Sequence, residues 1–245
     1  MESFSQYYQD RIIDVLLKKK RNGVFLDIGA HDGVTLSNTY FFEKNRNWTG
    51  LCIEPIPSVY KKLIYNRTCI TENCCILDKE QEIIFRQVEG YAEMLSGMLE
   101  FFDEDHIARI DQEIMQFGGS YTDIRMKAKN INNLLIKYNL FMMDYCSIDT
   151  EGAELSIIKS IDFKTFDIKL FSIENNSGEN ELKEYLATLG YICIRGETDN
   201  FYLKGNYTLC QKLFILSFFF MAHVQSFKTI LYSKLQKIKN IIGIK

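Results

Sequence analysis

Residues 25–34 of the chain read FLDIGAHDGV, an apolar run that ends in an acidic residue and two glycines. Val24–Ile28 has the β-branched and aromatic composition of a buried strand. Gly29 and Gly33 follow it, and glycines between a strand and a helix let backbone N–H groups approach a ligand closely. The stretch therefore predicts a strand–turn–helix unit that holds a ligand at the carboxyl end of the strand.

The charge of Asp27 indicates what kind of ligand this is. A dinucleotide site has the pattern GxGxxG, and here only Gly29 and Gly33 are present. A carboxylate in the turn would repel a pyrophosphate but attract a cation. Asp27 therefore suits the ammonium or sulfonium group of S-adenosylmethionine. An NAD-dependent oxidoreductase stays as a disfavoured alternative.

A second acid ends the next strand. In LCIEP, residues 51–55, Glu54 stands where an acid can accept hydrogen bonds from both ribose hydroxyls of an adenosine. Pro55 and Pro57 then end the strand and start the next helix. Asp27, the glycines and Glu54 together predict an adenosyl-binding site. The alternative is a capping aspartate, ordinary turn glycines and a surface glutamate.

Strands and helices alternate along most of the chain. The strand candidates are Val24–Ile28, Gly50–Glu54, Cys74–Leu77, Tyr145–Asp149 and Lys169–Glu174, with helical patterns at Leu36–Lys44, Ser58–Asn66, Ile131–Tyr138, Ala153–Ser160 and Asn180–Leu189. This alternation predicts an α/β fold with a mostly parallel sheet and helices on both faces. Tyr191–Ile194 and Phe201–Leu203 predict an antiparallel hairpin that closes the sheet. A second ribbon is expected from Cys74 to Arg86, and residues 89–129 are expected to form a cap over the cleft.

Composition bounds the class of protein. The 245 residues are 47% hydrophobic and 25% charged, which is ordinary for a globular protein. A net charge of −3 gives no general attraction to nucleic acid. The seven cysteines form no CxxC pair, which predicts reduced thiols in a cytoplasmic protein rather than disulfides or a zinc site. The polar start of the chain predicts no secretory signal.

The last forty residues differ from the rest. From residue 206 onward there is no Asp or Glu and there are six lysines, so we place a domain at 1–205 and an apolar, basic helical extension at 206–245. The apolar run LFILSFFFMA, residues 213–222, is too short to span a membrane. Followed by lysines, it is similar to an interfacial helix on anionic lipid, which would make the protein peripheral to a membrane. The alternative for residues 213–240 is packing on the sheet or on a second subunit.

Two long blocks resemble a known family. FLDIGAHDGVTLSNTYFFEKNRNWTGLCIEP, residues 25–55, and MDYCSIDTEGAELSIIKSI, residues 143–161, resemble the FkbM family of S-adenosylmethionine-dependent methyltransferases. The resemblance covers roughly residues 20–205. It implies the class I methyltransferase fold, a Rossmann-like sheet of about seven strands with a reversed last strand. It also implies O-methylation, with a sugar, glycan or polyketide hydroxyl as the acceptor.

The resemblance also implies where the cofactor lies. The implied cofactor-binding residues are Asp27, Gly29, Ala30, His31 and Gly33 in the first loop, Ser37 and Asn38 near the methionine end, Glu54 and Pro55 near the ribose, and Asp78 on the adenine side. Between residues 89 and 129 only MLSG, residues 94–97, matches the family faintly. The residues that contact the acceptor are therefore not implied.

The turn SIDTEGAE, residues 147–154, holds the candidates for the chemistry. Methyl transfer to a hydroxyl requires alignment of the reacting atoms and benefits from a positioned base. Asp149 and Glu151 are both candidates for this base, because crowded carboxylates raise one another's pKa. Glu154 is expected to be structural or to cap a helix, and the alternative for these acids is a favourable effect on the helix N-terminus only. His31, in the cofactor loop, is a third candidate, as a base or as an acceptor contact.

A divalent cation is an open alternative at the same place. Asp149, Glu151 and Glu174 could converge and supply oxygens to Mg²⁺, but nothing in the sequence demands a metal, and no metal ligand is assigned. His106, which has acidic neighbours, is interpreted as part of a solvated helix face. The non-enzyme alternative is an adenosyl-binding module or membrane-associated adaptor without chemistry, which the intact motifs disfavour.

Overall fold

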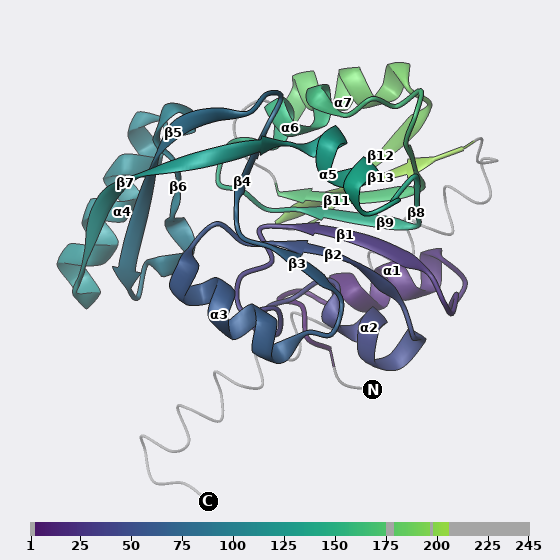
Figure 1. Ribbon diagram of the computed structural model, residues 1–245, viewed down its shortest axis with the longest axis horizontal. Coiled ribbons are helices and arrows are strands. Elements are labelled where there is room, and N and C mark those ends of the chain that lie inside the picture. Colours follow the sequence, from purple (N-terminus) through teal and green to yellow (C-terminus); the bar gives the residue numbers. More distant parts are fainter. Residues whose placement is uncertain (1–2, 175–178, 197, 206–245) are drawn as a thin grey trace, which may run out of the picture.

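The computed structural model describes residues 3–174, 179–196 and 198–205 (Figure 1). The extension predicted at 206–245, with its membrane or subunit contacts, lies outside these residues. Within them, none of the helices combines the length and the hydropathy needed to cross a bilayer.

Seven strands form the central sheet in the order β12-β13-β11-β9-β1-β2-β3. Their bounds are β1 Val24–Ile28, β2 Thr49–Ile53, β3 Ile70–Glu72, β9 Tyr145–Ile148, β11 Leu170–Glu174, β12 Tyr191–Arg195 and β13 Asp199–Lys204. Strand β1 pairs in parallel with β2 on one side and β9 on the other. Strand β13 runs antiparallel to both of its neighbours, β11 and β12. The predicted parallel sheet with an antiparallel hairpin is therefore confirmed.

Helices cover both faces of this sheet, as predicted (Figure 1). One face carries α1 Gln9–Leu16, α2 Tyr40–Arg46 and α3 Pro57–Asn66, and the other carries α5 Ile131–Lys137, α6 Glu154–Ser160 and α7 Glu179–Thr188. Successive side chains of a strand point to opposite faces. Phe25 therefore packs with Ile13 of α1 and Phe42 of α2, while Leu26 packs with Leu135 of α5 on the other face.

A second sheet stands beside the first, in the order β4-β7-β5-β6. It consists of β4 Cys75–Leu77, β5 Gln81–Gly90, β6 Gly97–Met98 and β7 Gly119–Asn130, with helix α4 Glu104–Phe117 packed on it; β8 Met142–Met143 and β10 Asp167–Ile168 form a separate short pair. Figure 1 shows β5, β7 and α4 extending away from the central sheet. Glu72, at the end of β3, joins the two sheets because it accepts hydrogen bonds from Lys129 of β7 (2.8 Å) and from Lys137 and Tyr138.

Two strand predictions are wrong. The third strand of the central sheet is β3, Ile70–Glu72, and not Cys74–Leu77. Strand β3 is a half-buried edge strand with a weak apolar signal, whereas β4, which belongs to the second sheet, is fully buried and has a strong one. The ribbon predicted from Cys74 to Arg86 does not form either, because β4 and β5 both pair with β7, which lies between them.

Candidate active site

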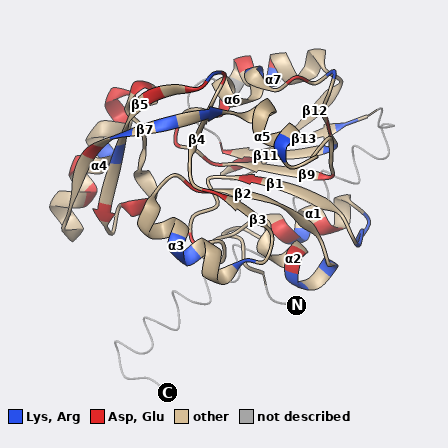
Figure 2. Cartoon of the chain, viewed as in Figure 1, with Lys and Arg blue, Asp and Glu red and all other residues tan. Residues whose placement is uncertain are grey.

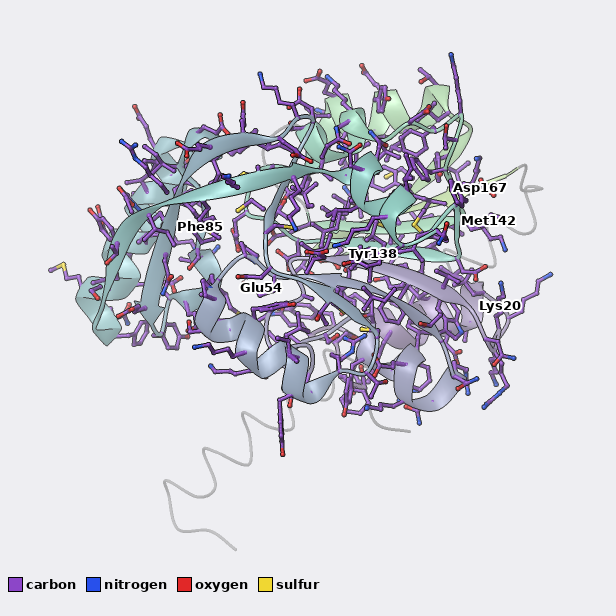
Figure 3. All side chains as sticks on the ribbon, viewed as in Figure 1. Lys20, Glu54, Phe85, Tyr138, Met142 and Asp167 are labelled. Carbon is purple, nitrogen blue, oxygen red and sulfur yellow. The ribbon has the colours of Figure 1, made fainter. Side chains whose placement is uncertain are left out.

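A cavity of about 260 Å³ lies at the carboxyl ends of β1, β2, β9 and β11. This is where open α/β sheets bind ligands. The central sheet lines it with Asp27–His31, Glu54–Ile56, Ser147, Asp149–Glu151 and Glu174, and the second sheet and its helix line it with Phe85, Glu93–Ser96, Met98 and Arg109. Six residues of the segment 89–129 thus line the cavity. Figure 3 labels Glu54 and Phe85, one from each sheet, well away from Lys20 at the amino end of β1.

Gly29 brings the two motif blocks into contact. Its backbone has φ 88°, and its N–H donates to the carbonyl oxygen of Ile53 at 3.0 Å. A Cβ atom at this position would lie 1.8 Å from the carbonyl oxygen of Asp149. Only glycine allows this approach, so the turn after β1 and the turn after β9 sit directly against one another.

Asp27 is a buried acid that lines the cavity. Its side chain is 4% exposed, and one of its oxygens accepts a hydrogen bond from the Thr39 hydroxyl. Burial raises the pKa of Asp27, although the charge of Arg67 and the hydrogen bond from Thr39 act in the opposite direction. A carboxylate held this way can offer its charge to a cationic group in the cavity.

Arg67, which the sequence analysis missed, fixes the loop around Asp27. Its side chain is fully buried, and its guanidinium donates to Glu43 at 2.7 Å, to the Gly33 carbonyl at 3.0 Å and to the Thr39 hydroxyl at 3.1 Å. Burial would raise the pKa of Glu43, but the charge and hydrogen bonds of Arg67 lower it to about 2. Nothing local marks Arg67 in the sequence, because its partners come from residues 33–43.

Glu54 and His31 meet at the mouth of the first loop. The carboxylate of Glu54 accepts backbone N–H groups from His31 at 2.9 Å and from Ile56 at 2.8 Å. Burial raises the pKa of Glu54 to about 7 in spite of these two bonds. The Nε2 atom of the His31 ring lies 3.1 Å from a carboxylate oxygen of Glu93. Pro55 and Ala30 line the cavity beside them.

Ser37 and Asn38 also line the cavity, as expected. They lie before α2, which begins at Tyr40 and not at the predicted Leu36, because Leu36 adopts a left-handed φ of 55°. The Ser37 hydroxyl accepts the N–H of Tyr40 at 3.1 Å, and the Asn38 amide donates to Ser147 at 3.1 Å. Both side chains are therefore held in place from the loop and from β9.

Asp78 does not line the cavity. It is an exposed residue after β4, in the second sheet, and its predicted adenine-side position depended on Cys74–Leu77 being the third strand of the central sheet. That place is lined instead by apolar side chains that the sequence analysis did not assign to the site: Ile56, Cys74, Cys75, Ile76 and Met98. A planar, apolar ligand group fits such a wall better than a charged one.

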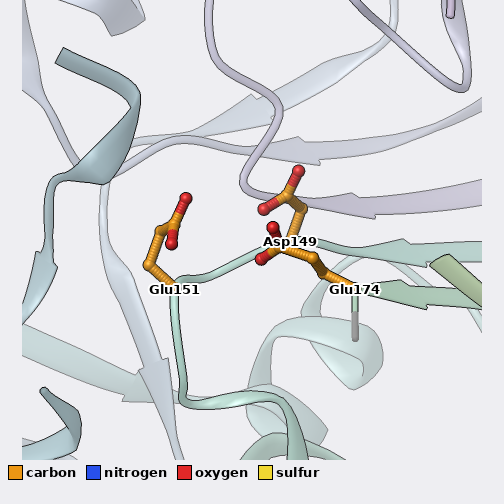
Figure 4. A group of neighbouring side chains, drawn as sticks. All are labelled: Asp149, Glu151 and Glu174. Atoms are coloured by element: carbon orange, nitrogen blue, oxygen red, sulfur yellow. The ribbon is translucent and has the colours of Figure 1, made fainter. Parts of the chain in front are cut away.

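Three carboxylates converge in the cavity. Oxygen atoms of Asp149, Glu151 and Glu174 all lie within 4.8 Å of one another, which confirms the predicted convergence (Figure 4). Asp149 is exposed to the cavity although protein surrounds it; this enclosure raises its pKa well above the usual range, and the charges of Glu174 and Glu151 add to the effect. Burial and the charge of Glu174 raise the pKa of Glu151 to about 8. Such a cluster must take up a proton or a cation to be stable.

Glu154 has the structural role expected of it. It is buried, and one of its oxygens accepts hydrogen bonds from the Thr150 N–H at 2.9 Å and the Gly152 N–H at 3.1 Å. These bonds hold Glu151 in a left-handed conformation with φ 55°. A non-glycine residue keeps such a conformation only where its surroundings impose it.

His106 is not on a solvated helix face, contrary to the sequence interpretation. Its side chain is 14% exposed, with Nε2 3.0 Å from the Leu95 carbonyl and Nδ1 3.6 Å from Glu151. The face of α4 that carries Ile110 packs into a small core of the second sheet, and His106 lies close to Glu151, which lines the cavity. Gln6 and Gln9 from the N-terminal segment line the cavity as well and had no signal in the sequence.

Fold and site together define the class of protein. Class I methyltransferases have a seven-stranded sheet with one reversed strand next to its edge. They also have a glycine turn after the central strand and acids near the carboxyl ends of the first two strands, where this chain has Asp27 and Glu54. The profile of the Methyltransferase FkbM domain matches residues 27–196, so the chain belongs to the FkbM methyltransferase family.

Solved structures of methyltransferases are similar to the chain at low identity. The methyltransferase FkbM from Methylobacillus flagellatus KT is 13% identical, with 74% of this chain and 43% of that chain covered and a TM-score of 0.46. Aeropyrum pernix fibrillarin, with natively bound S-adenosyl-L-methionine, is 11% identical, with 80% and 75% covered and a TM-score of 0.39. The chain thus spans less than half of the first of these proteins. A comparison with curated proteins finds no match.

Proposed function

We propose that this methyltransferase transfers a methyl group from S-adenosylmethionine to a hydroxyl group of a sugar or glycan. The observation that carries the proposal is that two sets of acids line one cavity. Asp27 and Glu54 line it together with apolar side chains, and the carboxylates of Asp149, Glu151 and Glu174 converge in it. The first set suits a donor with a cation, a ribose and an adenine, and the second suits a neutral hydroxyl that must lose a proton.

Asp27, Glu54 and the apolar side chains beside them fit S-adenosylmethionine. Asp27 offers a negative charge to its amino-acid portion, the carboxylate of Glu54 can accept the ribose hydroxyls, and Cys74 and Ile56 provide apolar surface for the adenine. At Gly29 a side chain would collide with the Asp149 carbonyl oxygen, so the glycine holds the turn after β1 against the turn after β9. When bound, the donor supplies a methyl group on a positively charged sulfur.

The cluster of three carboxylates supplies the base for the acceptor. Asp149 or Glu151 takes the proton of the acceptor hydroxyl while the oxygen–carbon bond forms and the carbon–sulfur bond breaks, leaving S-adenosylhomocysteine and the methyl ether. Positioned general bases of this kind contribute roughly 10²- to 10⁴-fold in rate. The acids of this cavity disfavour a nucleic-acid acceptor, because they would repel its phosphates.

Calorimetry tests the donor assignment directly. We expect S-adenosylmethionine and S-adenosylhomocysteine to bind and NAD not to bind. Transfer of a radiolabelled methyl group onto a panel of neutral glycans then identifies the acceptor. A folded protein with no affinity for either sulfur ligand would overturn the proposal.

Replacing Asp27 by Asn is expected to weaken donor binding by about 10- to 100-fold, the worth of one charged hydrogen bond. Asn keeps the shape and the bond with Thr39 but loses the charge. Titration calorimetry measures the change. Asp78→Asn is the matched control, because the same substitution at this exposed residue outside the cavity is expected to leave the affinity unchanged.

The rate of methyl transfer is expected to rise between pH 7 and pH 9 and to be unaffected by EDTA. The pKa of Glu151 is about 8, so the carboxyl group is mostly protonated at pH 7 and gains its basic form as the pH increases. A divalent cation on Asp149, Glu151 and Glu174 would keep all three ionised at pH 7. Loss of activity in EDTA together with a flat pH profile would therefore assign a metal ion to the cluster and contradict its stabilisation by a bound proton.

A further inference from the structure

One long strand edge has no partner strand among the described residues. Strand β5 pairs with the inner edge of β7 over the whole register from Gln81–Ala128 to Gly90–Gly119. On the outer edge, β4 pairs only with Ala128, Lys129 and Asn130. The outer edge from residue 119 to residue 127 thus presents a row of backbone N–H and C=O groups to which another strand can bind.

The side chains along this edge are open to solvent. Residues 119–123, Arg125 and Lys127 are exposed, and Figure 2 shows blue Lys and Arg segments along β7. Charged residues usually protect an edge, because an approaching strand meets like charges. On β7 the charges have both signs, because Asp123 is followed by Arg125 and Lys127. Whether they repel or attract a second strand therefore depends on the register of the pairing.

Symmetry leaves few registers for a second copy of this chain. In an antiparallel pair, the side chains of two opposite residues lie on the same face of the sheet. A twofold axis between two copies of one strand must therefore pass through a residue position and not midway between two residues. When the axis passes through residue 122, 123 or 124, at least seven residues of the segment 119–127 pair with the partner strand. Any other axis pairs fewer of them. An axis at residue 122 places no opposite charges together, and an axis at residue 123 places Asp123 against the partner's Asp123.

The axis at Ile124 is self-complementary. It places Asp123 opposite the partner's Arg125 twice, and Tyr121 opposite the partner's Lys127 twice. The paired segment is then 121–127, which ends where β4 begins to occupy the edge. Asp123 is already oriented by its own-chain Arg86, with both nitrogen–oxygen distances 2.8 Å, and its side chain remains 35% exposed. Opposite charges directly across a strand pair are stabilising, and like charges are destabilising.

We propose that two copies of this chain associate through β7, antiparallel about a twofold axis at Ile124, so that their second sheets form one continuous sheet. The association does not depend on the proposed methyl transfer. A pairing of seven residues buries less area than a standard interface, so we expect a dissociation constant on the order of 10 to 100 μM. Because the charge pairs are exposed, the dimer weakens in 0.5 M salt.

Sedimentation equilibrium of the full chain tests this register with two charge-reversal variants. Arg125→Asp places Asp against Asp at both pairs, and Asp123→Arg places Arg against Arg, so each variant alone is expected to dimerise at least about tenfold more weakly. An equal mixture of the two restores both opposite-charge pairs in a heterodimer. The mixture is therefore expected to dimerise like the original protein, which also shows that both variants are folded.

Lys62→Asp, on the exposed face of α3, is the matched control, since it makes the same change of charge away from β7. It is expected to dimerise as the unchanged chain does. A chain that stays monomeric at about 200 μM, well above the expected constant, would overturn the proposal. So would a dimer that tolerates both reversals, because its interface would lie elsewhere, for example in residues 206–245.

Discussion

Replacing Asp149 by Asn is expected to lower the rate of methyl transfer by about 10²- to 10⁴-fold if Asp149 is the base, while leaving donor affinity nearly unchanged. Asn has the shape of Asp but cannot accept the proton of the acceptor hydroxyl. The backbone carbonyl that packs on Gly29 is not altered, so the donor turn keeps its position. Radiolabelled transfer at saturating donor measures the rate, and calorimetry measures the affinity.

Glu151→Gln, measured beside it, identifies the base. If Glu151 is the base, its variant loses the chemistry, and Asp149→Asn alters the pH profile more than the maximal rate. Full activity in both variants would contradict a carboxylate base in this cluster. A chain that binds the donor but shows no transfer even without substitution would instead support the non-catalytic module left open by the sequence.

Replacing Arg67 by Met is expected to lower the free energy of unfolding by about 3–5 kcal/mol, the usual loss when one partner of a buried ion pair is removed. The substitution leaves Glu43 and Asp27 without their buried cation and removes the bond that holds the Gly33 carbonyl. Urea denaturation measures the change, with the linear dependence on denaturant as a check on two-state behaviour.

The double variant Arg67→Met/Glu43→Gln separates the charge from the packing, because it removes the uncompensated carboxylate and should recover part of the loss. The pH dependence has a definite sign. The folded pKa of Glu43 is lowered to about 2, so its stabilisation is present above its unfolded pKa of about 4.3 and disappears as the pH falls toward 2. The difference in the free energy of unfolding between the original chain and Arg67→Met should therefore decrease from pH 6 to pH 2. A loss below about 1 kcal/mol at pH 7 would assign Arg67 no buried-pair role.

The sequence was most informative where the signal is local. Asp27 and Gly29 belong to one strand–turn unit and Glu54 to the next, and their places in the cavity follow from the parallel sheet alone. The convergence of Asp149 with Glu174 could be expected for the same reason, because parallel strands end at one edge.

The features that the sequence did not predict depend on contacts between segments that are distant in the chain. Arg67 and His106 bind groups 24 to 45 residues away, and no periodicity reports such partners. Strand β3 was passed over because a half-buried edge strand carries few apolar residues, and Asp78 was misplaced with it. The predicted pairing of β4 with β5 is wrong because β7, some forty residues later in the chain, lies between them.

The contact between Gly29 and the carbonyl of Asp149 constrains how this site can be re-engineered. The two turns touch without an intervening side chain, so under the proposed function the backbone of the central sheet sets the distance between the methyl donor and the acids. Mutagenesis aimed at a new acceptor should therefore spare these turns and randomise the opposite wall, from Phe85 to Arg109, where shape can change while the reacting distance stays the same.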